Sequence, residues 1–231
     1  MQIKGAQELG IDLTTDQKEQ FFIIYKELIE WNNNFNLTSI TSKEEIEAKH
    51  FLDSLTLIKA VDLENVSTLL DIGSGAGFPG IPLKIAFPHL SVTLIDSTRK
   101  KVNFMNHVIE KLALKNIRAI FCRSEDLPKD MRETFDVVTS RAVADLRVLC
   151  EYCMPYAKLN GLFVAYKGKD IQDEFDQAGN AISILGGKHE RTVRLTLPGT
   201  DMIRNLIVIK KQDRTPSSFP RRAGMAKKNP L

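Results

Sequence analysis

The residues best suited to chemistry are an acid and a run of glycines that end one short apolar stretch. Asp71 closes the stretch Thr-Leu-Leu-Asp, and Gly73, Gly75 and Gly77 follow at every second position. Glycine tolerates a positive φ, so the backbone can turn tightly and approach a ligand closely. An apolar segment with an early proline follows and can begin a helix. Strand, glycine turn and helix in this order open a nucleotide-binding α/β unit.

Two classes of nucleotide compete for this loop. Gly75, Gly77 and Gly80 match the G-x-G-x-x-G pattern of dinucleotide sites. From Asp71 onward, the loop instead matches an acid followed by G-x-G-x-G, the pattern of S-adenosylmethionine sites. The glycine at the end of the strand is Gly73, and a carboxylate there repels a pyrophosphate and attracts a cationic methionyl group. Both points favour S-adenosylmethionine, and a tight turn without a ligand is the structural alternative.

A second acid supports the nucleotide-binding interpretation. The apolar, β-branched stretch Ser91–Ile95 predicts a strand, and Asp96 follows it, 23 residues after Gly73. An acid at about this distance, roughly 20 residues on, holds the ribose hydroxyls in such folds. The alternative is an N-cap for a helix that begins near Thr98. Because both cofactor classes use this acid, it supports the fold more than the chemistry.

Composition limits the class of protein. The chain has 231 residues, 43% of them hydrophobic, which is enough for one core of common domain size with appendages. It has neither an apolar run of membrane-spanning length nor a signal-type stretch at residues 1–8, so we expect a cytoplasmic protein. Cys150 and Cys153 form a single C-x-x-C without a nearby histidine. We therefore expect free thiols in the core and no metal site.

Charge is spread unevenly along the chain. Residues 1–67 hold 6 basic and 12 acidic side chains, residues 68–209 hold 19 and 16, and residues 210–231 hold 7 and 1. The excess of positive charge therefore lies in the last segment. A basic tail suggests a polyanionic partner such as RNA, with a solvated, disordered end as the alternative.

Strand and helix patterns alternate from residue 68 onward, which predicts a mostly parallel sheet. The expected strands begin at Thr68 and cover Ser91–Ile95, Ile117–Phe121, Phe135–Thr139, Asn160–Tyr166, His189–Leu195 and Asn205–Lys210; the expected helices are Thr14–Trp31, Ser42–Ala60, Thr98–Leu114, Asp145–Ala157 and Ile171–Leu185. The first two helices begin with capping-box patterns. His50 and Asp53 lie near one face of the second, where a satisfied or exposed histidine is the favoured interpretation.

Seven strands that end in such a pair favour one fold class. They fit the α/β fold of class I S-adenosylmethionine-dependent methyltransferases, a Rossmann-like, seven-stranded and mainly parallel sheet, better than a dehydrogenase. We expect an N-terminal helical extension (1–62), a methyltransferase domain (63–211) and a basic C-terminal tail (212–231).

Several motifs together resemble one family. They are Asp71-Ile-Gly-Ser-Gly-Ala-Gly-Phe-Pro-Gly80, Ile95-Asp-Ser97, Ser140-Arg-Ala142, Phe219-Pro-Arg-Arg-Ala-Gly224 and Lys228-Asn-Pro-Leu231, preceded by Asn36-Leu-Thr38 and His50-Phe-Leu-Asp-Ser-Leu55. From Trp31 onward, the chain resembles the RsmG (GidB) family of small-subunit ribosomal RNA guanine-N7 methyltransferases. The Gly-Phe-Pro-Gly extension and the Pro-Arg tail are its specific signals. The chain departs from the family at Phe219, where Tyr is usual, and at Arg222, where Lys is common.

Residue roles follow partly from position and partly from this resemblance, which implies S-adenosyl-L-methionine as the cofactor. The expected cofactor-binding residues are Asp71, Gly73, Gly75, Phe78, Asp96, Ser97, Thr98, Ser124, Glu125 and Arg141, and the expected substrate-binding residues are Lys167, Arg221 and Arg222. Asp96 would hold the ribose, and Glu125 would accept from the adenine amino group, with a first-turn helix acid as its alternative. Arg141, at a strand exit, could pair with the cofactor carboxylate, an RNA phosphate or a structural acid, and we favour the cofactor.

Methylation of guanine N7 needs little machinery, because this nitrogen has an in-plane lone pair and no proton to lose. In-line placement of donor and acceptor suffices, without a general base or a catalytic side chain. An adenine-N6 enzyme usually has Asn/Asp-Pro-Pro-Tyr/Phe after the fourth strand, where this chain has Ser140-Arg-Ala-Val143. A cytosine-C5 enzyme needs a cysteine nucleophile, but Cys150 and Cys153 lie in an apolar helix. We therefore expect N7 methylation of a guanine in 16S ribosomal RNA.

Other functions stay open. The chain could be a methyltransferase for another RNA, a protein or a small molecule. A protein or small-molecule substrate would leave the basic tail unexplained. An NAD-binding protein would use Gly75, Gly77 and Gly80. An intact cofactor loop with both acids argues against a non-catalytic RNA-binding module. The expected partner is 16S ribosomal RNA or the small ribosomal subunit, with a monomeric protein and neither membrane nor metal.

Overall fold

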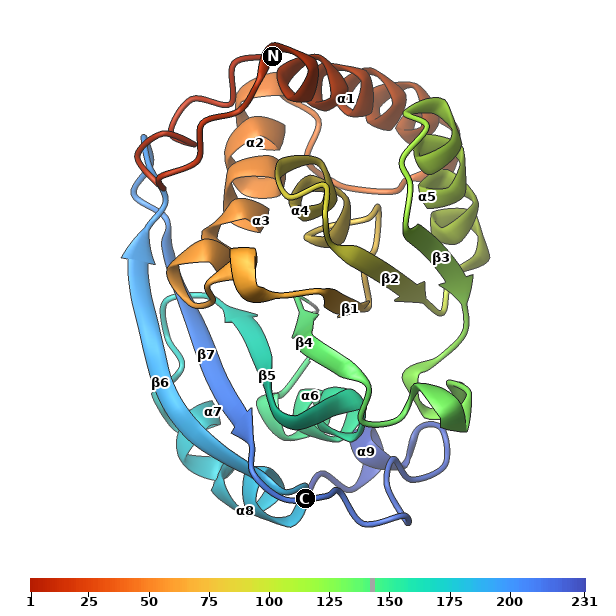
Figure 1. Cartoon of the computed structure of the whole chain (residues 1–231), viewed down its shortest axis with the longest axis vertical. Helices are drawn as coiled ribbons and strands as arrows, with labels where there is room; N and C mark the ends of the chain where they lie inside the picture. The colour runs from red at the N-terminus through yellow and green to blue at the C-terminus, as the bar shows by residue number, and fades with distance from the viewer. Residues whose placement is uncertain (142–143) are drawn as a thin grey trace.

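The computed structural model describes residues 1–141 and 144–231; residues 142 and 143, which close the predicted Ser-Arg-Ala-Val motif, lie outside the described residues. Within the described ranges, seven strands form one sheet in the order β3-β2-β1-β4-β5-β7-β6 (Figure 1). Their bounds are β1 (Thr68–Ile72), β2 (Ser91–Asp96), β3 (Ile117–Phe121), β4 (Phe135–Ser140), β5 (Ala157–Lys167), β6 (Gly187–Thr196) and β7 (Ile203–Lys211). Strand β7 is antiparallel to β5 and β6, whereas the other pairs are parallel. The predicted seven-stranded sheet is confirmed.

Helices cover both faces of this sheet (Figure 1). In the described part of the chain they are α1 (Thr15–Phe35), α2 (Lys43–Ile46), α3 (Asp53–Leu55), α4 (Gly80–Ala86), α5 (Arg99–Lys111), α6 (Leu146–Cys153), α7 (Gln172–Gln177), α8 (Gly179–Ile184) and α9 (Met225–Lys228). Helices α1 to α5 pack on one face and α6 to α9 on the other. Neighbouring side chains of β1 point to opposite faces of the sheet. Leu69 belongs to the hydrophobic core beneath α1, α4 and α5, and Leu70 belongs to the core beneath α6 and α8.

Strand register brings the candidate residues to one edge. Ile72 at the end of β1 lies opposite Ile95 of β2, and Asp71 lies opposite Thr139 of β4. The glycine turn after β1 and Asp96 at the end of β2 therefore emerge together at the carboxyl edge of the parallel strands. Ligands bind at this edge in open α/β sheets.

Helix α1 begins with the predicted capping box. Thr14 Oγ1 accepts from Gln17 N at 3.2 Å, and Thr14 N donates to Gln17 Oε1 at 2.8 Å. The helix continues to Phe35, so its expected end at Trp31 was wrong. The Trp31 ring packs on Phe104 of α5 with centroids 5.5 Å apart. This tertiary contact holds the last turn in helical form.

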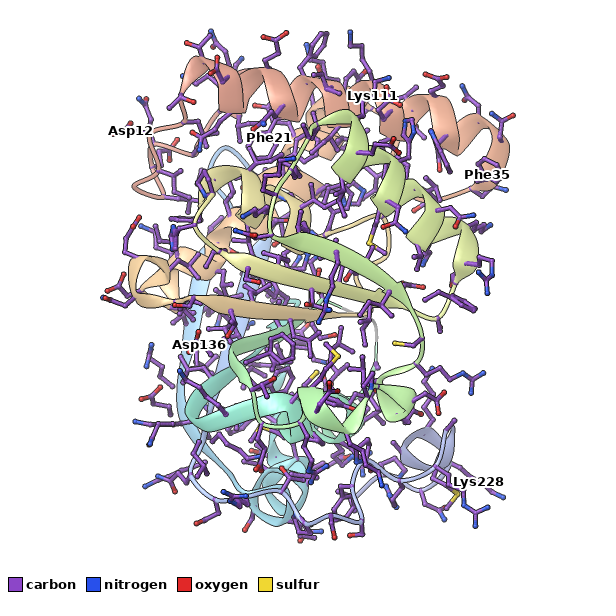
Figure 2. The ribbon with its side chains drawn as sticks, turned by 45° about the vertical axis from the view of Figure 1, so that its right-hand side comes forward. Asp12, Phe21, Phe35, Lys111, Asp136 and Lys228 are labelled. Carbon is purple, nitrogen blue, oxygen red and sulfur yellow. The ribbon has the colours of Figure 1, made fainter. Side chains whose placement is uncertain are left out.

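A buried acid joins α1 to α5. Glu27 accepts a hydrogen bond from Lys111 Nζ at 2.6 Å and contacts His107 Nε2 at 2.6 Å. Burial acts to raise the pKa of Glu27, but these two hydrogen bonds outweigh it and hold the pKa below its ordinary value. Lys111 lies at the end of α5 beside α1 (Figure 2). The N-terminal helices share one core with the sheet, and the domain boundary at residue 62 stays a prediction.

The second helical stretch is continuous but irregular. Ser42 caps it by accepting from Glu45 N at 3.2 Å, which is the N-cap half of the predicted capping box. After α2, the residues Glu47–Leu52 form a π-helical turn, α3 follows, and Thr56–Lys59 form a 3₁₀ turn. Single π-helical turns occur frequently at functional sites. The other predicted helix at Ile171–Leu185 is broken into α7 and α8 just before Gly179, a residue type that weakens helix interiors.

The segment after β7 packs on the domain. Arg132 donates to the carbonyl oxygens of Thr215 at 2.6 Å and Pro216 at 2.9 Å, and also to that of Phe219. Ala226 of α9 is buried. This packing argues against the alternative of a solvated, disordered end. The tail is irregular up to α9, and it packs nonetheless, because Arg132 supplies donors for its carbonyl oxygens.

All three cysteines of the chain carry free thiols. Cys150 and Cys153 are free and buried, as predicted, and Cys122 is free and half-buried. Among residues 1–141 and 144–231, no group of three or more His, Cys, Asp or Glu side chains is arranged to hold a metal ion. In the same ranges, no helix combines the length and apolarity that crossing a membrane requires.

Candidate functional site

The glycine turn after β1 has the backbone shape that only glycine adopts easily. Gly73, Gly75 and Gly77 have φ values of 75°, 62° and 90°. Gly73 N donates to the carbonyl of Ile95 at 2.9 Å, which ties the turn to β2. A Cβ at Gly77 would lie 2.4 Å from Ile81 Cδ1, whereas a Cβ at Gly75 would meet no atom within 4 Å. Gly77 is therefore required for packing, and Gly75 faces open space.

Asp71 lies buried beneath this turn. Gly80 N donates to Asp71 Oδ2 at 3.0 Å, and no described residue is hydrogen-bonded to Asp71 Oδ1. Burial raises the pKa of Asp71 to about 7. A buried acid with an unused oxygen can take a proton, a water or a cationic ligand group.

Asp96 links the glycine turn to the start of α5. Its Oδ2 accepts from Gly75 N at 3.0 Å, and its Oδ1 accepts from Thr98 N at 2.8 Å. Thr98 is the N-cap of α5, so Asp96 also satisfies a donor at the start of that helix. Each carboxylate oxygen can accept a second hydrogen bond. The capping and ligand-binding roles predicted as alternatives are therefore compatible.

Three hollows follow one another along this edge of the sheet. The strand-end hollow has a volume of about 330 Å³ and is lined by Ile72, Gly73, Ile95, Asp96, Ser97, Cys122, Arg123, Ser124, Glu125, Ser140, Ala144, Leu149, Tyr152, Gly224 and Lys227. The loop hollow has a volume of about 380 Å³ and is lined by Leu37, Thr38, His50, Gly73, Ser74, Gly75, Ala76, Phe78, Asp96, Ser97, Thr98, Lys101 and Arg141. The arginine hollow has a volume of about 890 Å³ and is lined by Ile40, Lys49, His50, Asp53, Arg141, Ala144, Asp145, Tyr166, Lys167, Gly168, Glu174, Met202 and Arg204. The strand-end and loop hollows share Gly73, Asp96 and Ser97. The loop and arginine hollows share His50 and Arg141, and the strand-end and arginine hollows share Ala144.

The structure brings most of the predicted site residues together. Those expected to hold the cofactor line the strand-end or loop hollow, except Asp71, which lies beneath them. Lys167 lines the arginine hollow, where its Nζ pairs with Glu174. Arg221 and Arg222 are not among the lining residues of any of the three hollows. Arg221 instead pairs with the buried Glu151, to which its Nε donates at 2.9 Å.

The outer wall of the strand-end hollow includes residues that the sequence did not indicate. Gly224 N donates to Glu125 Oε1 at 3.2 Å, so the tail reaches the predicted adenine-binding acid. Lys227 and Tyr152 complete this wall. Burial raises the pKa of Tyr152 to about 12 and that of Cys122 to about 11, so both stay protonated near neutral pH. The Phe-Pro-Arg tail motif was the one sequence signal that pointed here.

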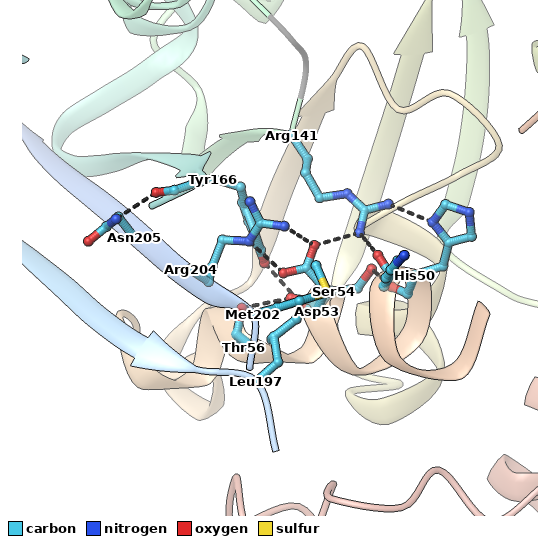
Figure 3. A network of polar contacts seen from close by, with 12 residues as sticks. His50, Asp53, Ser54, Thr56, Arg141, Tyr166, Leu197, Met202, Arg204 and Asn205 are labelled. Carbon is cyan, nitrogen blue, oxygen red and sulfur yellow. Dashed lines mark hydrogen bonds and ion pairs between the residues drawn. The ribbon is translucent and has the colours of Figure 1, made fainter. Parts of the chain in front are cut away.

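A buried network forms the floor of the arginine hollow (Figure 3). Asp53, with its side chain 1% exposed, pairs with two arginines. Arg141 Nη1 donates to Asp53 Oδ2 at 2.9 Å, and Arg204 donates from Nε to Oδ1 at 2.6 Å and from Nη2 to Oδ2 at 2.8 Å. Arg141 thus forms the structural ion pair that was one of its three predicted alternatives. Its expected contact with the cofactor stays a prediction. Arg204 was missed because nothing near it in the sequence marks it.

His50 is satisfied within this network, as predicted. Its Nδ1 lies 3.3 Å from Arg141 Nη2, and its Nε2 lies 3.0 Å from Thr38 Oγ1. Because a guanidinium can only donate, Nδ1 accepts, which assigns the proton of the neutral ring to Nε2. The pKa of His50 is lowered to about 4, mainly by burial and secondly by repulsion from the Arg141 charge. The ring stacks on Phe78 of the glycine loop, with centroids 4.6 Å apart and planes 4° apart.

Comparison with known proteins gives a consistent result. A family model described as GidB, rRNA small subunit methyltransferase G, matches residues 17–206. A ribosomal RNA small subunit methyltransferase G of Lachnoclostridium phytofermentans is 52% identical over 231 residues, which cover 99% of this chain and 96% of that protein. One of Bacillus licheniformis is 47% identical over 229 residues, covering 98% and 96%.

Solved structures of lower similarity share the fold. A precorrin-6y C5,15-methyltransferase of Geobacter metallireducens aligns with a TM-score of 0.51 at 15% identity, over 68% of this chain and 87% of that one. A 16S rRNA adenine-N1 methyltransferase of Catenulisporales acidiphilia aligns with a TM-score of 0.54 at 15% identity, over 64% and 86%. Together with the strand order, these similarities show the class I S-adenosylmethionine-dependent methyltransferase fold.

Proposed function

Because this chain belongs to the GidB family of rRNA small subunit methyltransferases, which use S-adenosylmethionine, we propose that it methylates N7 of a guanine in 16S ribosomal RNA. Family membership gives the enzyme class, the cofactor and small-subunit ribosomal RNA as the substrate. The choice of atom and the mechanism go further, and they are supported by the chemistry of the three hollows.

The residues around the glycine turn fit this cofactor. Asp96 would accept from the ribose hydroxyls, and Glu125 would accept from the adenine amino group. Asp71, with its unused buried oxygen, suits the cationic amino acid end of the cofactor, and Gly75 leaves room for it. When bound, the cofactor supplies a methyl group on a positively charged sulfonium.

Three side chains near the loop are poorly suited to base or nucleophilic catalysis. The one acceptor nitrogen of neutral His50 is used by Arg141. The raised pKa values of Cys122 and Tyr152 keep a thiol and a phenol protonated. Guanine N7 already carries a lone pair in the plane of the base, so the protein needs to hold the base in line with the methyl group and to exclude competing water.

The acceptor base would enter between the loop hollow and the arginine hollow. These hollows meet at His50 and Arg141, and the arginine hollow also borders the strand-end hollow at Ala144. Lys167 at the wall of the arginine hollow and the exposed Arg222 of the tail remain the proposed RNA contacts. Arg221 is the weaker candidate, because its guanidinium holds a buried glutamate.

One observation carries the proposal: Asp71 and Asp96 flank an open Gly75 in a chain of this family. The test incubates the protein with labelled S-adenosylmethionine and 16S ribosomal RNA, or with small ribosomal subunits, and analyses the digested nucleosides by mass spectrometry. Label in 7-methylguanosine is expected. Label in a methylated adenosine or cytidine would refute the choice of atom. As a cofactor control, S-adenosylmethionine at 100 times its Kd should stabilise the fold by about 2.7 kcal/mol, and NAD should not.

A further inference from the structure

Two guanidinium groups share one buried carboxylate on the floor of the arginine hollow. The side chains of Arg141 and Arg204 are 14% and 15% exposed, and Asp53 is almost fully enclosed. His50 beside them is neutral by its hydrogen-bonding pattern. The cluster of Asp53, Arg141, Arg204 and His50, here called the arginine cluster, therefore has one positive charge more than it has negative charges.

The other acids of the hollow do not balance this charge. Asp145 bonds to Arg147 at 2.9 Å, and Glu174 bonds to Lys167. Each of these acids thus has a basic partner outside the arginine cluster. A shielded charge without a counter-charge is unfavourable, so the cluster is suited to take up an anion.

Both arginines keep donors for such an anion. Arg204 uses Nε and Nη2 on Asp53, and no described residue accepts a hydrogen bond from its Nη1. Arg141 uses Nη1 and Nη2, and its Nε has no acceptor among the described residues. Guanidinium groups with free N–H donors bind phosphate oxygens well, and Asp53 fixes both groups in place.

We propose that Arg141 and Arg204 bind a phosphate of the RNA backbone next to the acceptor guanine, with Asp53 as their positioning residue. This inference rests on the proposed function and names the part of the RNA that the arginine hollow recognises. The hollow, about 890 Å³, is large enough for a nucleotide. Arg204 lines this hollow but not the loop hollow, so RNA is a better source of the anion than the carboxylate of the cofactor.

The test compares Arg204→Gln with Arg194→Gln. Arg194 is an exposed arginine on β6, where it lies opposite Asn205, the neighbour of Arg204 on β7. For each variant we would measure the Kd for a 16S ribosomal RNA transcript at several salt concentrations, the Kd for S-adenosylmethionine by calorimetry, and kcat and KM. Arg204→Gln should weaken RNA binding and raise KM about tenfold and reduce the salt slope by about 0.7, with cofactor affinity unchanged. Arg194→Gln should behave as wild type.

Arg204→Lys should recover the salt slope but only part of the RNA affinity. It keeps the positive charge but loses the paired, planar N–H donors of the guanidinium. Melting temperatures of all variants establish that they fold. Unchanged RNA affinity and salt slope in folded Arg204→Gln would overturn the inference, and loss of cofactor affinity alone would assign the anion to the cofactor. RNA binding is measured without methyl transfer, so these outcomes stand apart from the proposed function, which fails only if wild-type protein forms no 7-methylguanosine.

Discussion

The strand-end hollow and the arginine hollow lie at the same edge of the sheet but are built by different means. The first uses backbone N–H groups and carboxylates at the ends of neighbouring strands, and Asp96 accepts from a residue 21 positions away. The second depends on side chains that are 88 and 151 positions from Asp53. Removing an acid from the first hollow should therefore affect a ligand, whereas removing one from the second should affect the fold.

Asp53→Ala should break this comparison most visibly. It leaves two enclosed guanidinium groups without their counter-charge, and loss of one partner of a buried pair costs about 3–5 kcal/mol. Urea unfolding measures the change. The control Glu190→Ala removes a pair with Arg191 that lies on the exposed face of β6 and should change little. A stability close to wild type in Asp53→Ala would mean that the network is not a structural unit.

Arg221→Ala tests whether the tail behaves like the arginine hollow. The side chain of Glu151 is 1% exposed and accepts hydrogen bonds from Arg221 N, Nε and Nη2. Because Arg221→Ala leaves this buried carboxylate without its guanidinium partner, it should destabilise the fold by about 3 kcal/mol. The neighbouring Arg222 is exposed, and Arg222→Ala should lower RNA affinity without lowering stability. Chemical denaturation and RNA binding on the same two variants separate the roles. If Arg221→Ala weakened RNA binding and left stability unchanged, Arg221 would be an RNA contact and not a structural partner of Glu151.

Asp96→Ala should act mainly on the ligand. Removing a charged acceptor from the ribose should weaken S-adenosylmethionine binding by roughly 1.5–3 kcal/mol. Asp96→Asn keeps one acceptor oxygen and should lose less. Calorimetry on folded variants gives both values, and an unchanged affinity in Asp96→Ala would remove the ribose assignment.

Asp71 should give an effect of a different kind, a pH dependence of stability. Its pKa is about 7 in the folded protein against an ordinary 3.8, so between these values the folded state holds more of its proton than the unfolded state. Stability from this group therefore falls as pH rises from about 4 to 7, by at most about 1.4 kcal/mol per pH unit. His50, with a folded pKa of about 4 against 6.5, acts in the opposite direction over part of this range. The difference between wild type and Asp71→Asn isolates the contribution of Asp71, and identical pH profiles would contradict it.

The glycine turn and its two acids could be predicted because their geometry is encoded locally. Gly73 and Gly75 need a positive φ, and parallel register then places Asp96 beside them. The same logic predicted a mainly parallel sheet of seven strands with a final pair, since alternating strands and helices allow few topologies. The order of the strands in the sheet was not predicted. The capping box of Thr14 was local in the same sense.

The arginine hollow could not be predicted in this way. The residues of a π-helical turn read like those of an α-helix, and Arg204 looks like any polar residue at the start of a strand. Glu151 resembled an ordinary helix acid until the tail brought Arg221 to it. These pairings depend on tertiary packing, for which a single sequence has no periodic signal.

The pairing of Asp53 with an arginine of β7 has a consequence for the order in which the protein matures. During synthesis the carboxylate emerges first, Arg141 follows 88 residues later, and Arg204 follows after 151. The half-made chain can close the parallel part of its sheet and offer Arg141 to this acid, but the pairing with Arg204 has to wait until β7 docks on β5. We therefore expect the docking of β7 to complete the pairing of this acid late in folding. A nascent chain without β7 should leave Asp53 partly exposed to water, and should be cut near this residue by a protease that spares the finished protein.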